Sequence, residues 1–416
     1  HPEVVRADLE KRHDTEKLAW VDTILEQDKL FRELTVKNNE LRARRNSIAK
    51  EINAAKKAVE DPSPLFAEAK ALPQRIKEND EVMEKAMETV QYHLMRLPNI
   101  LHESVPYGKD NSENVVIKTV GTPRTFDLEL MIHGELCVQN GWVDFERATM
   151  TSGAGFYFLK GNLALLDMAL QRFAIDTLVA KGYILIVPPY MLNRKLYEDV
   201  TDLADFEKVM YKIDGDDEYL IATAEHPMAA MYQNEIFEEK DLPLKMVGIS
   251  PCFRREIGAH GLDSRGLFRV HQFTKVEQFI YCMPEKSWEM HDELLANSEE
   301  LFTKLGLPYH VVNICTGDIG TVAAKKYDIE AWMPRDNAYR EVVSCSNCTA
   351  YQACRLNIRV RDEHDFDSKQ YLHTLNSTAI ATSRALRCIL ENYQTEDGSV
   401  EIPQILRPYM QGREFL

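Results

Sequence analysis

Residues 252–279 read CFRREIGAHGLDSRGLFRVHQFTKVEQF, and this stretch decides how we interpret the fold. Two apolar runs carry charged residues and are joined by a loop that contains three glycines. Side chains alternate between the two faces of a strand, so Arg254 and Glu256 share a face of the first run. The residues that share a face of the second run are Arg269, His271, Phe273, Lys275 and Glu277. We therefore predict a strand hairpin that presents arginine, glutamate and aromatic side chains on one surface.

This charged surface has two explanations. Burying a charge is unfavourable unless the charge is paired, so these residues do not fit an ordinary apolar core. They fit either a ligand site or a structural ladder of salt bridges. The residues alone leave both explanations open.

Residues 30 to 97 differ from the rest of the chain, because they are densely charged and contain no glycine. Alternating steps of four and three residues trace two heptad seams, which indicate paired helices. The prolines of Asp61-Pro62-Ser63-Pro64 are expected to end the first helix and force a turn. We predict an antiparallel hairpin with about 26 residues per helix and a length of roughly 40 Å. The seams are Leu34, Asn38, Leu41, Arg45, Ile48, Ile52, Ala55 and Val59, then Leu72, Ile76, Asn79, Met83, Ala86, Val90, His93 and Leu97.

The first helix of this arm is basic, although the chain has a net charge of −16. From Lys29 to Lys57 it carries nine Lys or Arg residues and three Glu residues. One explanation is a solvated coiled-coil face; the other is a surface that follows the phosphates of an RNA duplex. The net charge argues against a protein that coats nucleic acid, and we expect no DNA partner. The candidate RNA contacts are Arg42, Arg44, Arg45, Lys50, Lys56 and Lys57.

The rest of the chain predicts an α+β domain. Pro98 to about Gly121 is typical of a linker, and short β-like runs then alternate with amphipathic helices such as residues 380–393. We expect a large, mostly antiparallel sheet flanked by helices. The sequence contains no internal repeat, Walker-type loop or Rossmann glycine pattern, so any nucleotide site is built differently. We divide the chain into residues 1–105, with the arm at about 30–97, and residues 106–416.

Composition narrows the class of protein. At 416 residues and 44% hydrophobic content, the chain has enough apolar material for one large core and an appendage. No stretch approaches the roughly 18 consecutive apolar residues of a membrane helix, so we expect no membrane partner. We expect a cytoplasmic location. A chain that begins at His1 also leaves open an organellar matrix location after removal of a transit peptide.

Five segments resemble a known family. One segment resembles motif 2 of class II aminoacyl-tRNA synthetases, in the form found in seryl-tRNA synthetases. It consists of Phe253-Arg254-x-Glu256, the glycine loop and RVHQFxKVEQF. The other four segments also occur in the family's order. They are Gly182 to Pro189, which resembles motif 1; Thr223-Ala224-Glu225, which resembles the serine loop; Arg340 to Cys348, which resembles the metal and ATP segment; and Leu375 to Gln394, which resembles motif 3.

The resemblance implies a class II synthetase sheet, an N-terminal tRNA-binding arm and a homodimer formed through motif 1. It implies activation of L-serine with ATP and transfer to serine tRNA. Arg254 would bridge the α-phosphate and the serine carboxylate, and Arg269 and Arg384 would hold the β and γ phosphates; the planar fork of Arg suits such contacts. Phe273 would stack on adenine, beside Glu256. The implied ATP-binding residues are Arg254, Arg255, Glu256, Arg269, Val270, Phe273, Glu341, Val342, Val343, Ser344 and Arg384.

The resemblance also implies how serine and magnesium bind. Glu225 and Thr223, with Ala224, would bind the ammonium group of serine. Glu277 and Thr378 would bind its hydroxyl, while Asn376 shapes the pocket. The catalytic residues would be Arg254, Glu277 and Arg384, with Mg²⁺ held by Glu341 and Ser344, because oxygen ligands suit this hard cation.

Other assignments are left open. Cys345-x-x-Cys348 fits packed thiols or a zinc site, and a lone CxxC pair is weak evidence for zinc, so we expect none. His260 fits a tRNA contact or an exposed loop residue, and His271 fits a packed strand residue better than a catalyst. The sequence is also compatible with two other functions: an enzyme that passes its amino acid to a carrier protein, and a non-catalytic binding module with an interaction coiled coil.

Overall fold

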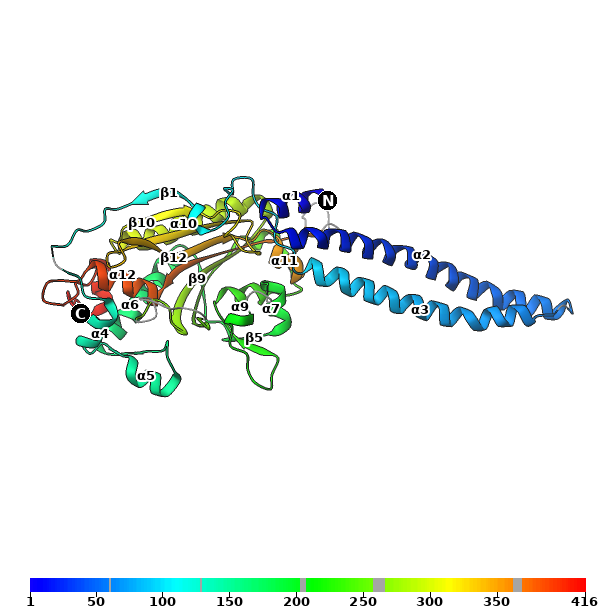
Figure 1. Ribbon diagram of the computed structural model, residues 1–416, viewed down its shortest axis with the longest axis horizontal. Helices are drawn as coiled ribbons and strands as arrows, with labels where there is room; N and C mark the ends of the chain where they lie inside the picture. The colour runs from blue at the N-terminus through cyan, green and yellow to red at the C-terminus, as the bar shows by residue number, and fades with distance from the viewer. Residues whose placement is uncertain (60, 128, 203–206, 257–265, 362–368) are drawn as a thin grey trace. The chain divides into compact units, whose positions relative to one another are not determined.

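The computed structural model describes residues 1–59, 61–127, 129–202, 207–256, 266–361 and 369–416. The chain divides into two compact units, His1–Pro98 and Asn99–Leu416. In Figure 1 the first unit is coloured blue to light blue, and the second runs from cyan to red.

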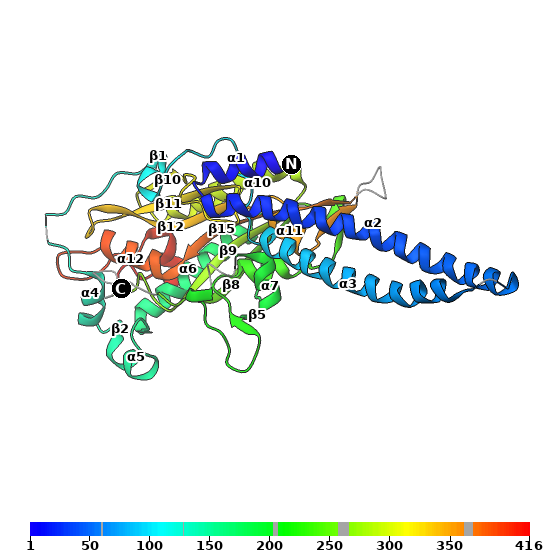
Figure 2. The ribbon, with the colours of Figure 1, turned by 45° about the vertical axis from the view of Figure 1, so that its right-hand side comes forward.

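The first unit is a long helical hairpin preceded by a short helix. Its helices are α1 (Pro2–Lys11), α2 (Thr15–Lys57) and α3 (Ser63–Leu94), and α2 and α3 lie side by side in Figures 1 and 2. The α2 helix has 43 residues, more than the sequence analysis expected. It begins early because Asp14 caps it: the Asp14 carboxylate accepts from the backbone N–H of Lys17 at 3.0 Å. At about 1.5 Å per residue, α2 is roughly 64 Å long.

The turn of the hairpin differs from the prediction. The α2 helix ends at Lys57, before the prolines, and Val59 has a left-handed backbone with φ of 60°. Pro62 and Pro64 stand at the start of α3, where the missing N–H of proline does no harm. The prolines therefore begin the second helix and do not end the first, which corrects the expected role.

The predicted seam is buried at most of its positions. Ile48 and Leu72 are each 2% exposed, and the Asn38 amide accepts a hydrogen bond from Asn79 at 2.7 Å across the two helices. Five seam residues are half-buried, and two, Arg45 and Val59, are exposed. Burying an unpaired guanidinium costs more than leaving it in water, and Val59 lies beyond the end of α2.

The second unit is built around a sheet of eight strands in the order β1-β10-β11-β12-β15-β9-β8-β4. Every neighbouring pair is antiparallel except β4 and β8, which confirms the predicted α+β class with a mostly antiparallel sheet. The strands are β1 (Val115–Val120), β4 (Ile184–Ile186), β8 (Leu244–Phe253), β9 (Gln272–Cys282), β10 (Tyr309–Asn313), β11 (Lys325–Met333), β12 (Ala338–Asn347) and β15 (His373–Ala381).

Helices and small sheets flank the large sheet (Figure 1). The helices are α4 (His133–Gln139), α5 (Phe145–Ser152), α6 (Gly161–Val179), α7 (Arg194–Val200), α9 (Glu225–Ala230), α10 (Ser287–Lys304), α11 (Tyr351–Arg355) and α12 (Thr382–Asn392). The short strands are β2 (Val143–Asp144), β3 (Phe158–Leu159), β5 (Met191–Asn193), β6 (Glu218–Leu220), β7 (Ile236–Glu238), β13 (Arg359–Arg361) and β14 (Lys369–Tyr371). None of the helices in the described ranges is long and apolar enough to span a bilayer.

The central hairpin of β8 and β9 is shorter than predicted. The two strands pair from Leu244 with Tyr281 to Phe253 with Gln272. Residues Arg254, Glu256, Arg269 and His271 therefore lie outside the strands, although the backbone N–H of Arg254 still donates to His271 at 2.9 Å. Residues 254–256 carry three consecutive charges, which a continuing buried strand would have to desolvate.

Strand β9 separates two cores. Its even-numbered residues Val276, Ile280 and Cys282 pack in the core that contains α6 and α10. Phe279 and Tyr281 pack on the other face, with residues of α7, α9 and α11. The odd-numbered face therefore continues towards the residues predicted to bind a ligand.

Candidate active site

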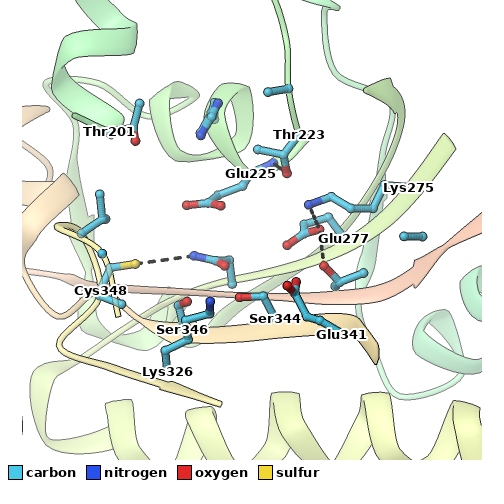
Figure 3. A pocket seen from close by; sticks show the side chains of 18 of the residues that line it. Thr201, Thr223, Glu225, Lys275, Glu277, Lys326, Glu341, Ser344, Ser346 and Cys348 are labelled. Carbon is cyan, nitrogen blue, oxygen red and sulfur yellow. Dashed lines mark hydrogen bonds and ion pairs between the residues drawn. The ribbon is translucent and has the colours of Figure 1, made fainter. Parts of the chain in front are cut away.

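A cavity of about 350 Å³ lies in the second unit, between β9, β12, β15, the first residues of α9 and α12, and residues 318–323 (Figure 3). It gathers many of the predicted site residues into one place. Those that line it are Thr223, Glu225, Arg254, Phe273, Glu277, Glu341, Val342, Ser344, Asn376, Thr378 and Arg384. The charged surface of the hairpin thus belongs to a cavity wall and not to a closed ladder of salt bridges.

Strand alternation places the residues from β9. Phe273, Lys275 and Glu277 occupy successive odd positions and all line the cavity, whereas Val276 is fully buried in the core behind them. This matches the predicted face for the part of the hairpin that forms a strand.

Two β-bulges place the residues from the neighbouring strands. Val342 is the extra residue in the pairing of β11 and β12, because Glu330 pairs with Glu341 and Ile329 with Val343. The bulge brings Glu341 and Ser344, three residues apart, to the same side of the strand. Ala379 is the corresponding extra residue of β15, and it allows both Thr378 and Ala381 to line the cavity.

Glu277 lies at the centre of a buried polar group. Its carboxylate is 2.6 Å from the Lys275 ammonium, and both side chains are at least nine-tenths buried. Thr378 donates its hydroxyl to Glu277 at 3.4 Å. Burial raises the pKa of Glu277, and the charge and hydrogen bond of Lys275 oppose that rise. The group therefore offers a carboxylate and a hydroxyl to a small polar ligand.

Glu225 is the second acid of the cavity, and Figure 3 shows its carboxylate and that of Glu277 pointing into the same space. Burial, together with the negative charge of Glu277, raises the pKa of Glu225 to about 7. The Thr223 hydroxyl accepts a hydrogen bond from the backbone N–H of Glu225 at 3.2 Å, which fixes the loop. Two acids side by side suit a cationic group of a ligand, because a cation relieves their repulsion.

Arg254 faces Phe273 across one end of the cavity. Its Nε donates to the carbonyl of Ala222 at 3.3 Å, and its guanidinium lies 5.7 Å from the centre of the Phe273 ring. One edge of the guanidinium is therefore held by backbone and one face by an aromatic ring. The remaining N–H groups suit a planar anion.

Arg384 and Glu341 form an ion pair at another wall of the cavity. Arg384 donates to both the carbonyl and the Oε1 of Glu341 at 3.0 Å. Burial acts to raise the pKa of Glu341, but the nearby charges of Arg384 and Lys326 prevail and lower it. The carboxylate is therefore ionised at neutral pH.

Several predicted residues do not line the cavity. Val270 and Val343 are 2% and 1% exposed, and Ala224 is fully buried immediately before α9. Arg255 and Arg269 are exposed, and the Arg255 guanidinium lies 5.4 Å from the centre of the Tyr211 ring. Glu256 is half-buried after the end of β8. The roles assigned to these residues stay predictions.

The two histidines of the hairpin have different outcomes. His260 lies outside the described residues. His271 stacks on Phe156 with ring centres 5.1 Å apart, and its Nδ1 shares a 2.6 Å hydrogen bond with the hydroxyl of Tyr211. It is not part of the cavity wall, which agrees with a packing role.

The cavity wall also contains residues that were not predicted from the sequence: Thr201, His226, Asp318, Lys326 and Ser346. Lys326 pairs with Asp328 at 3.3 Å, and alternation along β11 puts Lys326, Asp328 and Glu330 on one face. That pattern was visible in the sequence. His226 follows the serine-loop segment; burial, with the charges of Lys275 and Arg254, lowers its pKa to about 3, so the ring is neutral.

The cysteine pair lies partly at this site. Cys345 and Cys348 are buried free thiols, and Asn376 donates its amide to the Cys348 sulfur at 3.5 Å. Burial raises the pKa of both thiols. Within the described ranges, no group of three or more His, Cys, Asp or Glu residues is arranged to hold a metal ion.

The basic residues of the arm differ in their contacts: some form ion pairs or lie over an aromatic ring, and others are exposed to solvent. Arg44 donates to Glu68 at 2.7 and 2.8 Å and to Glu51 at 2.7 Å, so it links α2 to α3. Arg42 lies 3.3 Å from Asp80 and is more exposed. The Lys56 ammonium lies 5.0 Å from the centre of the Phe66 ring. Arg45, Lys50 and Lys57 are exposed.

Comparison with known proteins decides the family. The family model of the seryl-tRNA synthetase N-terminal domain matches residues 1–101, and that of the tRNA synthetase class II core domain (G, H, P, S and T) matches residues 208–393. A serine–tRNA ligase from Methanocorpusculum labreanum is 84% identical over 416 residues, which cover 100% of this chain and 98% of the relative. The chain belongs to the seryl-tRNA synthetase family.

Solved structures of this family agree with the fold. The crystal structure of seryl-tRNA synthetase from Pyrococcus horikoshii complexed with ATP is 49% identical, with a TM-score of 0.94 and coverage of 100% of this chain and 97% of that chain. The cytoplasmic serine–tRNA ligase from Naegleria fowleri in complex with AMP is 36% identical, with a TM-score of 0.89 and coverage of 100% and 96%. The resemblance drawn from the five segments is therefore confirmed.

Proposed function

We propose that this chain is a serine–tRNA ligase that activates L-serine with ATP and transfers it to serine tRNA. Membership of the seryl-tRNA synthetase family supports the reaction, since relatives of this name match the whole chain. The observation that carries the site is the convergence of Arg254, Glu277 and Arg384 with Glu225 and Thr378 on one cavity. This arrangement can bring two anions together beside a small cationic, hydroxyl-bearing ligand.

In the first step, a carboxylate oxygen of serine attacks the α-phosphorus of ATP. A new phosphorus–oxygen bond forms, the bond to the β-phosphate bridge breaks, and pyrophosphate leaves. Arg254 binds both the serine carboxylate and the α-phosphate, because its fork can donate to two anions at once. Positioning two anions in line, and balancing the charge that develops, are the main contributions that such a site makes.

The triphosphate and adenine occupy the Arg254 and Arg384 ends of the cavity. Arg384 and the exposed Arg269 hold the β and γ phosphates, and Phe273 stacks on adenine. Arg255, Glu256, Val270, Val342 and Val343 complete this binding region. In this arrangement ATP takes over the donors that Arg384 now directs to Glu341.

Serine binds between the two buried acids. Glu225, with Thr223 and Ala224, binds its ammonium group, while Glu277 and Thr378 bind its hydroxyl beside Asn376. Alanine lacks the hydroxyl, so it would make no hydrogen bond to Glu277 or Thr378 and would bind more weakly than serine. The ion pair of Lys275 with Glu277 favours the charged form of this acid, against the effect of burial on its pKa.

The residues fit a magnesium ion. Glu341 is ionised and Ser344 faces the same cavity, so the donors are oxygens, as a hard cation requires. Glu341 and Ser344 would hold the ion once ATP has drawn Arg384 away from the Glu341 carboxylate. When bound there, Mg²⁺ would neutralise charge on the phosphate oxygens.

In the second step, the terminal ribose hydroxyl of the tRNA attacks the carbonyl carbon of seryl-adenylate. The ester to the tRNA forms, AMP leaves, and the hydroxyl proton goes to a phosphate oxygen.

Residues 1–105 bind the tRNA through the arm. The arm residues that contact its phosphates are Arg42, Arg45, Lys50, Lys56 and Lys57, whereas Arg44 contributes mainly by joining the two helices. The enzyme acts in the cytoplasm.

The active form is a homodimer built through the motif 1 segment. Large apolar side chains are exposed on α6 and β4 and just after β4, including Met168, Ile184 and Val187. A group of exposed apolar side chains is typical of a protein interface. Analytical ultracentrifugation at micromolar concentration should give twice the chain mass of 47.9 kDa, and a single-chain mass would contradict the assignment.

The reaction is tested by exchange of labelled pyrophosphate into ATP. We expect exchange that depends on serine and on Mg²⁺, and charging of total tRNA with labelled serine. Threonine, alanine and cysteine serve as controls for the hydroxyl pocket. Exchange that another amino acid supports better than serine would contradict the proposal.

A further inference from the structure

Gln352 of α11 lies directly behind the serine pocket and was not among the predicted site residues. Its side chain is fully buried. Its amide nitrogen donates to Oε1 of Glu225 at 3.1 Å and to the carbonyl of Val200 at 3.0 Å. Its amide oxygen accepts from the hydroxyl of Thr374 at 2.7 Å. One side chain therefore ties Glu225 to the end of α7 and to β15.

The contacts fix which way the amide points. A backbone carbonyl only accepts hydrogen bonds, so the atom of Gln352 that faces Val200 is the nitrogen and not the oxygen. The oxygen then faces Thr374, whose hydroxyl can donate to it. Because the nitrogen has two hydrogens, one for Val200 and one for Glu225, the amide has no donor left over.

This geometry has a consequence for Glu225. Its Oε1 is held by Gln352, so the carboxylate cannot rotate freely, and Oε2 is the oxygen left for a ligand cation. Burial and the negative charge of Glu277 disfavour the charged carboxylate, whereas the charges of Lys275 and Arg254 and the bond from Gln352 favour it. A neutral amide does this without bringing a positive charge that would repel an ammonium group.

We propose that Gln352 is a positioning residue for serine recognition, which holds the Glu225 carboxylate ionised and turned so that it receives the ammonium group of serine. Thr374 supports it by holding the orientation of the amide. This inference rests on the proposed function, because it assigns the ammonium group to Glu225. It adds a residue that touches neither substrate.

The test is the Gln352→Met variant, which keeps the length and shape of the side chain but removes its donors. In pyrophosphate exchange at pH 7, we expect the KM for serine to rise about tenfold, the typical effect of losing a hydrogen bond to a charged group. The KM for ATP and the rate at saturating serine should change little. General damage to the fold would lower the rate or alter both KM values, and would not raise the serine KM alone.

The pH profile gives a second readout. Glu225 has a raised pKa of about 7, so in the native enzyme kcat/KM for serine should fall as the pH drops through about 7, when the carboxylate takes up a proton. Gln352 lowers this pKa, and removing it raises the pKa further. The acid side of the profile should therefore move to higher pH in Gln352→Met.

Two further variants complete the experiment. Gln394→Met is the matched control, because Gln394 is also a buried glutamine with bonds to backbone, at Met131, but does not line the cavity. It should leave the serine KM and the pH profile unchanged. Thr374→Val keeps Gln352 but removes the hydroxyl that orients its amide. It should raise the serine KM and move the acid side of the pH profile to higher pH, each by a smaller amount than Gln352→Met.

The outcomes separate this inference from the proposed function. Absence of serine-dependent exchange in the unmodified enzyme would contradict the proposed function. An active enzyme whose Gln352→Met variant keeps the native serine KM and pH profile would overturn the role of Gln352 alone. If Gln352→Met does not fold, Thr374→Val decides: native values for both readouts would then overturn the role.

Discussion

The catalytic cavity and the helical arm both carry many charged side chains, but they bury them to different degrees. In the cavity, Lys275 and Glu277 are at least nine-tenths buried and lie 2.6 Å apart. In the arm, Lys50 and Lys57 are exposed to solvent. Buried charges act over short distances with fixed partners, whereas exposed charges act over long distances and are screened by salt. The cavity is therefore suited to selecting a small ligand, and the arm to holding a large polyanion.

Deleting residues 35–92 separates the two roles most strongly. In the proposed function the arm and the catalytic unit bind one tRNA together, so losing the arm should lower kcat/KM for tRNA charging by about 10²- to 10⁴-fold. Serine-dependent pyrophosphate exchange should stay near the native rate, because the cavity lies within the second unit. Unchanged charging by the shortened enzyme would refute the assigned role of the arm.

Arg254→Ala should act on the cavity alone. Removing a donor that faces developing charge typically lowers kcat by about 10²- to 10³-fold, and the exchange assay should report this loss. Binding of serine tRNA, measured by filter retention, should be unaffected. Arg335→Ala is a matched control, since Arg335 is an arginine of the same unit that does not line the cavity. Equal losses in both variants would argue against a specific role for Arg254.

Lys275→Met tests the cost of burying charge in the cavity. The variant leaves Glu277 buried without its partner, and breaking such a pair typically destabilises a protein by about 3–5 kcal/mol. Thermal and urea unfolding should both show the loss, and it should be smaller at low pH, where Glu277 is protonated. A melting temperature equal to that of the native protein would mean that the ion pair contributes little.

Lys50→Glu should give the smallest effect. Each phosphate contact contributes about 0.7 to 0.9 to the slope of log affinity against log salt concentration. The variant should reduce the salt-dependence slope for binding of serine tRNA by about 0.7 to 0.9, the contribution of one phosphate contact. Serine-dependent pyrophosphate exchange should be unchanged. Lys11→Glu offers a control, because it changes the charge of the first unit outside α2 and α3. If the two variants reduce the slope equally, the effect is one of net charge.

The sequence predicted features that depend on local periodicity. Alternation along β9 correctly placed Phe273, Lys275 and Glu277 on one face, and heptad spacing correctly placed Ile48 and Leu72 on the buried seams of the arm. Both patterns repeat within a few residues, so they need no knowledge of distant neighbours.

Features that depend on pairing between distant segments were not predictable. The bulges at Val342 and Ala379 arise from the registers of β11 with β12 and of β9 with β15. Gln352 acquires its role only because folding brings Glu225 and Thr374, 127 and 22 residues away, to its amide. The early start of α2 depends on a single cap at Asp14, which the heptad pattern does not contain.

The most direct test of the whole account is a crystal structure of the enzyme with a non-hydrolysable analogue of seryl-adenylate. We predict the ammonium group within hydrogen-bond distance of Glu225, the hydroxyl at Glu277 and Thr378, and the Arg254 guanidinium on the α-phosphate position. An analogue bound with its hydroxyl away from Glu277, or with Arg254 turned out of the cavity, would contradict the account.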